Sequence, residues 1–115
     1  MTDEEVVLLG HALLKAMGNA ATANSKRWFP ELHERPGIDQ IVHMALGMAG
    51  EVGEVANIVK KINRYQVIRP GQHADLAEEL ADVFTYLLNL ATLLDIDLVT
   101  EFDRKQEICE QRWGT

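Results

Sequence analysis

One stretch of the sequence constrains the fold most: apolar residues recur every three or four positions from Ile38 to Tyr65, with no proline among them. This spacing places them along one face of a continuous α-helix. Such a helix would be roughly 40 Å long, whereas a domain of about this size has a radius of gyration of about 13 Å. We therefore expect a second subunit of a homo-oligomer to cover its ends; the alternative is a monomer in which this helix is frayed or kinked. The predicted buried stripe is Ile41, Ala45, Met48, Val52, Val55, Val59 and Ile62.

The rest of the chain also shows helical spacing, divided by proline and glycine. Thr2 and Glu5 form a capping-box pattern that begins a helix over about residues 3–20. The segment 19–35 is less regular and is predicted to be a loop with room for one short helix. Another helix is expected over about residues 73–94, and a last one from an Asp97 cap through Trp113, with Gly114 just beyond. The stripe of the helix over 73–94 is Leu76, Leu80, Val83, Leu87, Leu90 and Leu94.

No segment alternates apolar and polar residues for long enough to predict a strand. The fold class is therefore all-α, a bundle of four to five helices in a single domain over residues 1–115. The acidic N-terminus and the lack of an uninterrupted apolar run near 18 residues predict a soluble, cytoplasmic protein without a membrane partner.

Charge and cysteine content exclude several classes of function. The chain has 18 acidic and 11 basic side chains, which gives a net charge of −7. A large nucleic-acid interface needs a basic face, so we expect no nucleic-acid polymer as a partner. The single cysteine, Cys109, excludes a disulfide framework and a cysteine-built zinc site within one chain. If the protein handles phosphates, we expect a metal ion to mediate the contact.

Two pairs of acidic residues occupy matching positions on consecutive predicted helices. At about 100° per residue, Glu51 and Glu79 each lie about 65° from the centre of their apolar stripe. Their partners Glu54 and Asp82 each lie about 125° away. If the helices pack antiparallel through these stripes, four carboxylates converge at the edge of the core. Taken alone, each pair is also what an ordinary solvated helix face would show.

Converging carboxylates favour a bound cation. Two carboxylates about 5 Å apart repel by about 3 kcal/mol at an effective dielectric constant of about 20. Oxygen ligands suit Mg²⁺ or Mn²⁺, and Mg²⁺ in turn suits a phosphate substrate. Gly47, Gly50 and Gly53 lie where the acidic face begins, and each costs about 1 kcal/mol relative to alanine. They indicate close helix packing, room for a ligand, or both.

Other polar residues continue the acidic faces and are candidates for substrate binding. Tyr86 and Asn89 extend the line of Glu79 and Asp82, and Lys61 lies close to the face of Glu54. On the last helix, basic side chains follow the line of its apolar residues and could reach back over the core. These are Lys105 and Arg112.

The segments LGMAGEVGEV (residues 46–55) and ELADVFTYLLNL (79–90) resemble those of the MazG-like nucleotide pyrophosphohydrolases. This all-α superfamily also includes dimeric dUTPases and phosphoribosyl-ATP pyrophosphohydrolase, and its signature is Glu-x-x-Glu followed by Glu-x-x-Asp. The resemblance covers residues 38–113. It implies a homodimer or homotetramer that cleaves a nucleoside triphosphate to the monophosphate and pyrophosphate, in the housecleaning of the nucleotide pool.

The same resemblance implies roles for single residues. Glu51, Glu54, Glu79 and Asp82 match the Mg²⁺-binding acids, and we assign Glu54 as the acceptor of the proton from the attacking water. Tyr86 and Asn89 match positions that line the nucleotide site, and Lys105 matches a basic position of the last helix. Trp28 is a candidate for an aromatic wall against the base, although a structural role fits it equally well.

Two positions depart from the family pattern and leave the nucleotide preference open. Cys109 stands where an asparagine is common, and Lys61 stands where some members that prefer deoxycytidine carry a tryptophan.

Three alternatives compete with this interpretation. A di-iron bundle needs Glu-x-x-His on two helices, and none of the four histidines follows a glutamate by three residues, which excludes it. Hydrolysis of phosphoribosyl-ATP requires the same fold and stays open. A non-catalytic module for dimerisation or nucleotide sensing also stays open, although the intact set of four acids counts against it.

Overall fold

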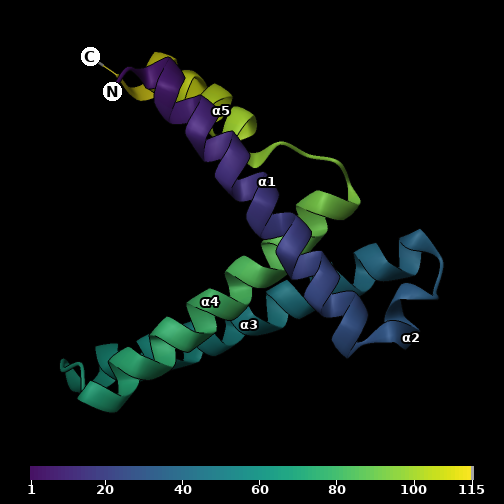
Figure 1. The fold of residues 1–115 in the computed structure, drawn as a ribbon. Coiled ribbons are helices and arrows are strands. Elements are labelled where there is room, and N and C mark those ends of the chain that lie inside the picture. The colour runs from purple at the N-terminus through teal and green to yellow at the C-terminus, as the bar shows by residue number, and fades with distance from the viewer. Residues whose placement is uncertain (115) are drawn as a thin grey trace.

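The computed structural model describes residues 1–114, which form five helices and, over that range, no strand. The helices are α1 (Asp3–Trp28), α2 (Pro30–His33), α3 (Gly37–Tyr65), α4 (Pro70–Leu93) and α5 (Leu98–Trp113). The predicted all-α class with four to five helices is confirmed (Figure 1).

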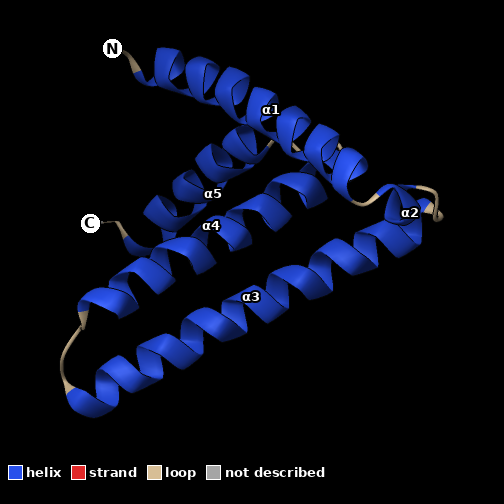
Figure 2. Ribbon diagram, turned by 60° about the horizontal axis from the view of Figure 1, so that its bottom comes forward, coloured by secondary structure: helices blue, strands red, loops and turns tan. Residues whose placement is uncertain are grey.

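The helices form two arms that meet at one end. α3 and α4 pack against each other as a long antiparallel hairpin, which is the arrangement that convergence of the acidic pairs requires (Figure 2). α1 crosses the end of this hairpin and contacts α4, and α5 turns back along the first half of α1 (Figure 1). The crossing is close, because a Cβ atom at Gly18 would lie 2.7 Å from the Thr92 hydroxyl oxygen.

The predicted end of the first helix, at about residue 20, is wrong. α1 continues beyond residue 20 to Trp28, because the alanines and asparagines of this segment are compatible with a helix and no proline precedes Pro30. Pro30 then occupies the first turn of α2, where its missing N–H costs nothing. α4 likewise begins at Pro70 rather than at His73, with the Gln72 side chain accepting a hydrogen bond from the Arg69 N–H.

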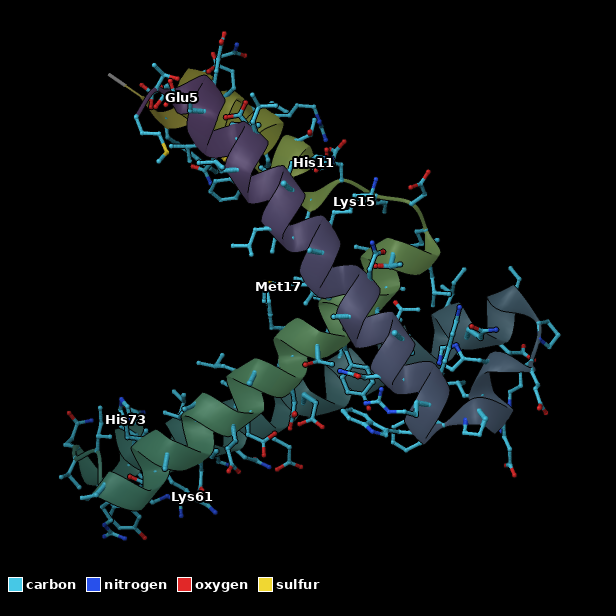
Figure 3. The ribbon with its side chains drawn as sticks, in the orientation of Figure 1. Glu5, His11, Lys15, Met17, Lys61 and His73 are labelled. Atoms are coloured by element: carbon cyan, nitrogen blue, oxygen red, sulfur yellow. The ribbon has the colours of Figure 1, made fainter. Side chains whose placement is uncertain are left out.

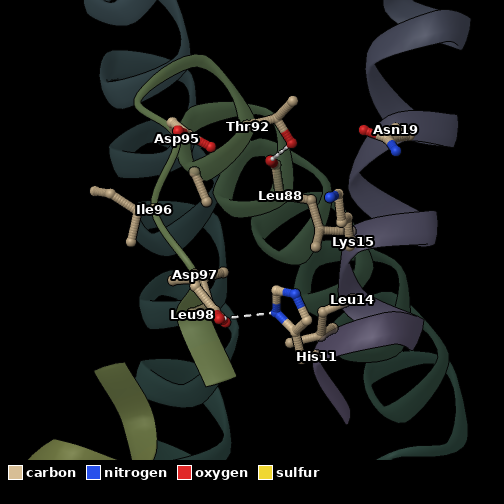
Figure 4. Close-up of a pocket in the computed structure, with 11 residues that line it drawn as sticks. His11, Leu14, Lys15, Asn19, Leu88, Thr92, Asp95, Ile96, Asp97 and Leu98 are labelled. Carbon is tan, nitrogen blue, oxygen red and sulfur yellow. Dashed lines mark hydrogen bonds and ion pairs between the residues drawn. The ribbon is translucent and has the colours of Figure 1, made fainter. Parts of the chain in front are cut away.

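The predicted caps are present. Thr2 accepts a hydrogen bond from the Glu5 N–H, and Asp97 accepts bonds from the N–H groups of Val99 and Thr100. Asp97 also pairs with His11 of α1 at 2.8 Å, beside a cavity of about 170 Å³ between α1 and the α4–α5 connection (Figure 4).

These contacts lower the pKa of Asp97 to about 2: the hydrogen bond from the Thr100 hydroxyl has the largest effect, burial opposes it, and the pairing with His11 lowers the pKa further. Because the folded-state pKa lies below the usual 3.8, Asp97 stabilises the fold above about pH 4. This contribution is lost as the pH falls towards 2.

The buried faces of α3 and α4 are rotated relative to the predicted stripes. Met44 is the buried residue of α3, and Ile58 joins the half-buried positions, whereas the predicted Val52 is 50% exposed. On α4 the predicted Leu80 is 56% exposed, and Glu79 next to it is half-buried. The contact face of each helix therefore runs through its first acidic residue rather than beside it.

The single chain buries little. Its buried apolar residues are Leu32, Met44, Leu88 and Ala91, and its radius of gyration is 17.0 Å, well above the roughly 13 Å of a compact domain of about 100 residues. Large apolar side chains stay exposed on both arms, and Met17 of α1 points into the opening between them (Figure 3).

Among residues 1–114, α1 is also the helix that could cross a membrane by its length and composition. α4 and α5 meet this criterion only when taken as one span, and they are bent by 102° relative to each other. Polar residues interrupt the apolar positions of α1, so it contains no uninterrupted apolar run of the kind sought in the sequence.

Candidate metal and nucleotide site

The antiparallel contact between α3 and α4 brings three carboxylates together. One oxygen each from Glu51, Glu79 and Asp82 can be chosen so that all three lie within 4.8 Å of one another. Glu51 and Glu79 are half-buried between the two helices, and Asp82 is exposed at the edge. The predicted convergence of acidic residues is thus found for three of the four.

Glu54 is exposed and lies outside this carboxylate cluster. The rotation of the contact face contributes to its position without fully explaining it. Since α3 faces α4 through Glu51, a residue three positions later points about 60° away from that contact. Asp82 has the same offset on α4, and its oxygen nevertheless reaches the cluster.

Glu79 shows why the cluster suits a cation. Its Oε2 atom is buried and has no hydrogen-bond partner among the described residues. The pKa of Glu79 is raised, first by a hydrogen bond with Glu51, then by burial, and then by the negative charges of Glu51 and Asp75. A buried carboxylate oxygen without a partner, beside two further carboxylates, matches the oxygen donors that Mg²⁺ and Mn²⁺ prefer.

An aromatic cavity of about 210 Å³ adjoins the carboxylate cluster. Its lining includes two of the acids, Glu51 and Asp82, and four ring-bearing residues, namely Trp28, Phe29, His43 and Tyr86. The last four residues also line a wider space of about 490 Å³ that extends outward to Arg35. Trp28 and Phe29 are 61% and 60% exposed, and the Arg27 guanidinium lies over one face of the Trp28 ring, 5.6 Å from its centroid.

The three glycines of α3 serve different purposes. A Cβ atom at Gly47 would overlap the Tyr86 ring, so Gly47 allows this ring to pack between the helices. A Cβ atom at Gly50 or Gly53 would meet nothing within 4 Å. Close packing therefore accounts for Gly47 alone, and the single chain leaves open space at the other two.

Asn89 lines the cavity and also forms hydrogen bonds with α1 and within α4. It is buried, its Oδ1 accepts a hydrogen bond from the Thr22 hydroxyl of α1, and its Nδ2 donates to the Thr85 carbonyl. Its side chain therefore joins α1 to α4 below the cavity.

Three predicted basic contacts are not brought to the site within one chain. Lys61 lies towards the far end of the α3–α4 arm (Figure 3), and it does not line the cavity. Lys105 and Arg112 lie on α5 in the other arm, where Arg112 stacks on Trp113 at 5.3 Å.

Sequence reasoning missed Phe29 and His43. The His43 ring lies 6.5 Å from that of Tyr86, and its position one turn before Gly47 was the available signal. Phe29 gave no periodic signal, because it lies in the turn between α1 and α2.

Comparison with known proteins agrees with this geometry. Residues 40–112 match the model of the MazG nucleotide pyrophosphohydrolase domain. The chain belongs to the MazG family. Its relatives include the Gene 37 protein of Mycobacterium phage L5, which is 36% identical over 86 residues that cover 73% of this chain and 75% of the phage protein. No solved structure matches the chain. The resemblance inferred from the two acidic motifs is thereby confirmed.

A glycine pair tests the packing of this MazG chain. Gly47→Ala should destabilise the fold by about 1–3 kcal/mol, because the added methyl group displaces Tyr86. Gly53→Ala should stabilise the same helix by about 1 kcal/mol, because it meets nothing in the single chain. Urea unfolding of both variants measures the difference, and equal effects of the two substitutions would contradict the assigned role of Gly47.

A second prediction concerns metal-linked stability. Mg²⁺ at 100 times its dissociation constant should stabilise the wild type by about 2.7 kcal/mol, if it binds only the folded state. Glu79→Gln should reduce this gain and, without metal, should not lower the melting temperature, because it removes a repelled charge. The matched control is Glu78→Gln at the exposed neighbouring position. A full Mg²⁺ effect in the Glu79 variant would mean that this residue is not a ligand.

Proposed function

We propose that this protein is a Mg²⁺-dependent nucleoside triphosphate pyrophosphohydrolase that converts a (d)NTP to the (d)NMP and pyrophosphate. The observation that carries the proposal is the position of the carboxylate cluster directly beside an aromatic cavity. A nucleoside triphosphate has the matching arrangement, with a planar base at one end and a metal-binding phosphate chain at the other. Membership of the MazG family supports the same reaction class, and housecleaning of the nucleotide pool is the role we propose for it.

The residues divide into two groups in this proposal. Glu51, Glu79 and Asp82 hold the cation, and Glu54 completes the set if its side chain turns towards them. When bound, Mg²⁺, or Mn²⁺ in its place, neutralises phosphate charge and thereby lowers the barrier to attack. The rings of Trp28 and Phe29 provide a stacking surface for the base, while Tyr86 borders both the rings and the acids.

Glu54 is the residue we assign to proton transfer. It lies one turn from Glu51, is exposed, and is not part of the carboxylate cluster. A carboxylate in this position can accept the proton of a water molecule as the water oxygen attacks the α-phosphorus. The bond from the α-phosphorus to the bridging oxygen then breaks, and pyrophosphate leaves.

We further propose that the protein acts as a homodimer or homotetramer. The exposed apolar residues of both arms and the radius of gyration of 17.0 Å support this assembly. A second copy would cover the apolar face of α1, which fits a soluble protein. It would also offer the basic residues that a single chain keeps away from the site, namely Lys61, Lys105 and Arg112.

Light scattering at micromolar concentration, without detergent, tests the assembly. We expect the mass of a dimer or a larger species, because burial of the exposed apolar faces favours association. A strictly monomeric mass, or a protein that stays in solution only with detergent, would contradict the proposal.

Asp82→Asn tests the proposed activity. The cation would lose a charged ligand, and a barrier higher by about 4 kcal/mol would slow pyrophosphate release roughly a thousandfold. Asp82 is exposed, so the fold should persist, and circular dichroism checks this. Asp103→Asn on α5 is the matched control and should keep wild-type turnover. Near-normal turnover of the folded Asp82 variant on the best nucleotide would exclude the carboxylate cluster as the active site.

A further inference from the structure

The aromatic turn, Trp28–Pro30, joins α1 to α2 and carries two of the rings that line the cavity. Both rings are more than half exposed, so burial contributes little to holding them beside the carboxylates. Exposed side chains in a connection between helices are ordinarily free to change rotamer. The Arg27 guanidinium lies over the Trp28 ring at 5.6 Å, and further contacts are needed to fix the whole turn if the cavity is to keep its shape.

A hydrogen bond that spans the turn meets this need. Ser25 lies buried in the last turn of α1, and its Oγ is 2.8 Å from Nε2 of His33, the last residue of α2. The Ser25 carbonyl also accepts a hydrogen bond of 2.8 Å from the N–H of Phe29, inside the aromatic turn. The side chain and the backbone of Ser25 thus hold the two sides of the turn together.

The same connection continues to α3. The Gln40 side chain donates to the Arg35 carbonyl at 2.8 Å and to the His33 carbonyl at 3.4 Å. Leu32, beside His33, is buried and lines the cavity together with Ser25. The end of α1, the short α2 and the start of α3 are therefore linked beside the cavity.

We propose that Ser25 and His33 are positioning residues, whose hydrogen bond holds the aromatic turn as the wall against which the nucleobase stacks. Neither side chain belongs to the carboxylate cluster. The proposal rests on the proposed function for the identity of the ligand. Ser25 and His33 therefore affect the affinity for the substrate, whereas the acidic residues bind the metal and transfer the proton.

The test uses Trp28 as a reporter. Trp28 and Trp113 are the two tryptophans of the chain, so Trp113→Phe leaves Trp28 alone. In this background we compare Ser25→Ala, His33→Ala and His33→Gln, whose amide can restore a hydrogen bond near the position of Nε2. His73→Ala, at the far end of the α3–α4 arm, is the matched control (Figure 3).

Loss of the hydrogen bond should raise the KM for the best nucleotide about fivefold, the effect of one such bond, with kcat within about twofold. The Ser25→Ala and His33→Ala variants should also show lower Trp28 fluorescence anisotropy without nucleotide, and His33→Gln should recover part of both effects. The Mg²⁺-induced melting shift should stay at the wild-type value. An unchanged KM and anisotropy, or a loss of kcat with KM unchanged, would overturn the proposal.

The two proposals fail in different ways. If the wild type releases no pyrophosphate from any nucleotide, the proposed function fails. The anisotropy of Trp28 still decides whether Ser25 and His33 hold the turn, because that measurement needs neither substrate nor metal. Wild-type anisotropy in both alanine variants would exclude the positioning role, whatever the activity.

Discussion

The antiparallel contact between α3 and α4 places Glu51 and Glu79 between two helices, where each carboxylate raises the electrostatic cost of the other. The apolar stripes on both sides of these residues supply the driving force that holds them there. A buried Glu79 oxygen, without a hydrogen-bond partner among residues 1–114, remains as the consequence. The divalent cation that we propose for this site would resolve both problems, because it would neutralise the charges and bind the free oxygen. The shape of the hairpin and the chemistry of the site therefore have one origin.

The remaining helices bring a second kind of surface to the same place. α1 crosses the hairpin and ends at Trp28, and the turn into α2 adds two aromatic rings to a cavity lining that includes two of the acids. The missing side chain of Gly47 leaves room for the Tyr86 ring. Asn89 of α4 joins this helix to α1 through its hydrogen bond with Thr22. This MazG chain thus presents a charged and an aromatic wall to one cavity. Large apolar side chains remain exposed in the single chain, and this exposure is the basis of the proposed assembly.

Much of this arrangement could be predicted from the spacing of apolar residues. That spacing indicates the all-α class, the pairing of α3 with α4 and the proximity of the acidic residues. The rotation of the contact faces could not be predicted, because side-chain volume across the interface decides which residues turn inward. Val52 and Leu80 consequently lie exposed. Glu54 lies outside the carboxylate cluster. The extension of α1 to Trp28 was missed because residues 19–28 show no regular apolar spacing, although their alanines favour a helix. Phe29 and His43 join the site through tertiary contacts without a sequence period.

The central claim is that the carboxylates of α3 and α4 form one cation site. Electron paramagnetic resonance of Mn²⁺ measures this directly, because the sharp signal of the free ion disappears on binding. We predict that the wild-type protein lowers the signal of free Mn²⁺, and that this loss saturates as Mn²⁺ is titrated into the protein. A variant that combines Glu51→Gln, Glu79→Gln and Asp82→Asn should stay helical by circular dichroism and leave the signal of free Mn²⁺ intact. Undiminished Mn²⁺ binding by this folded triple variant would contradict the account.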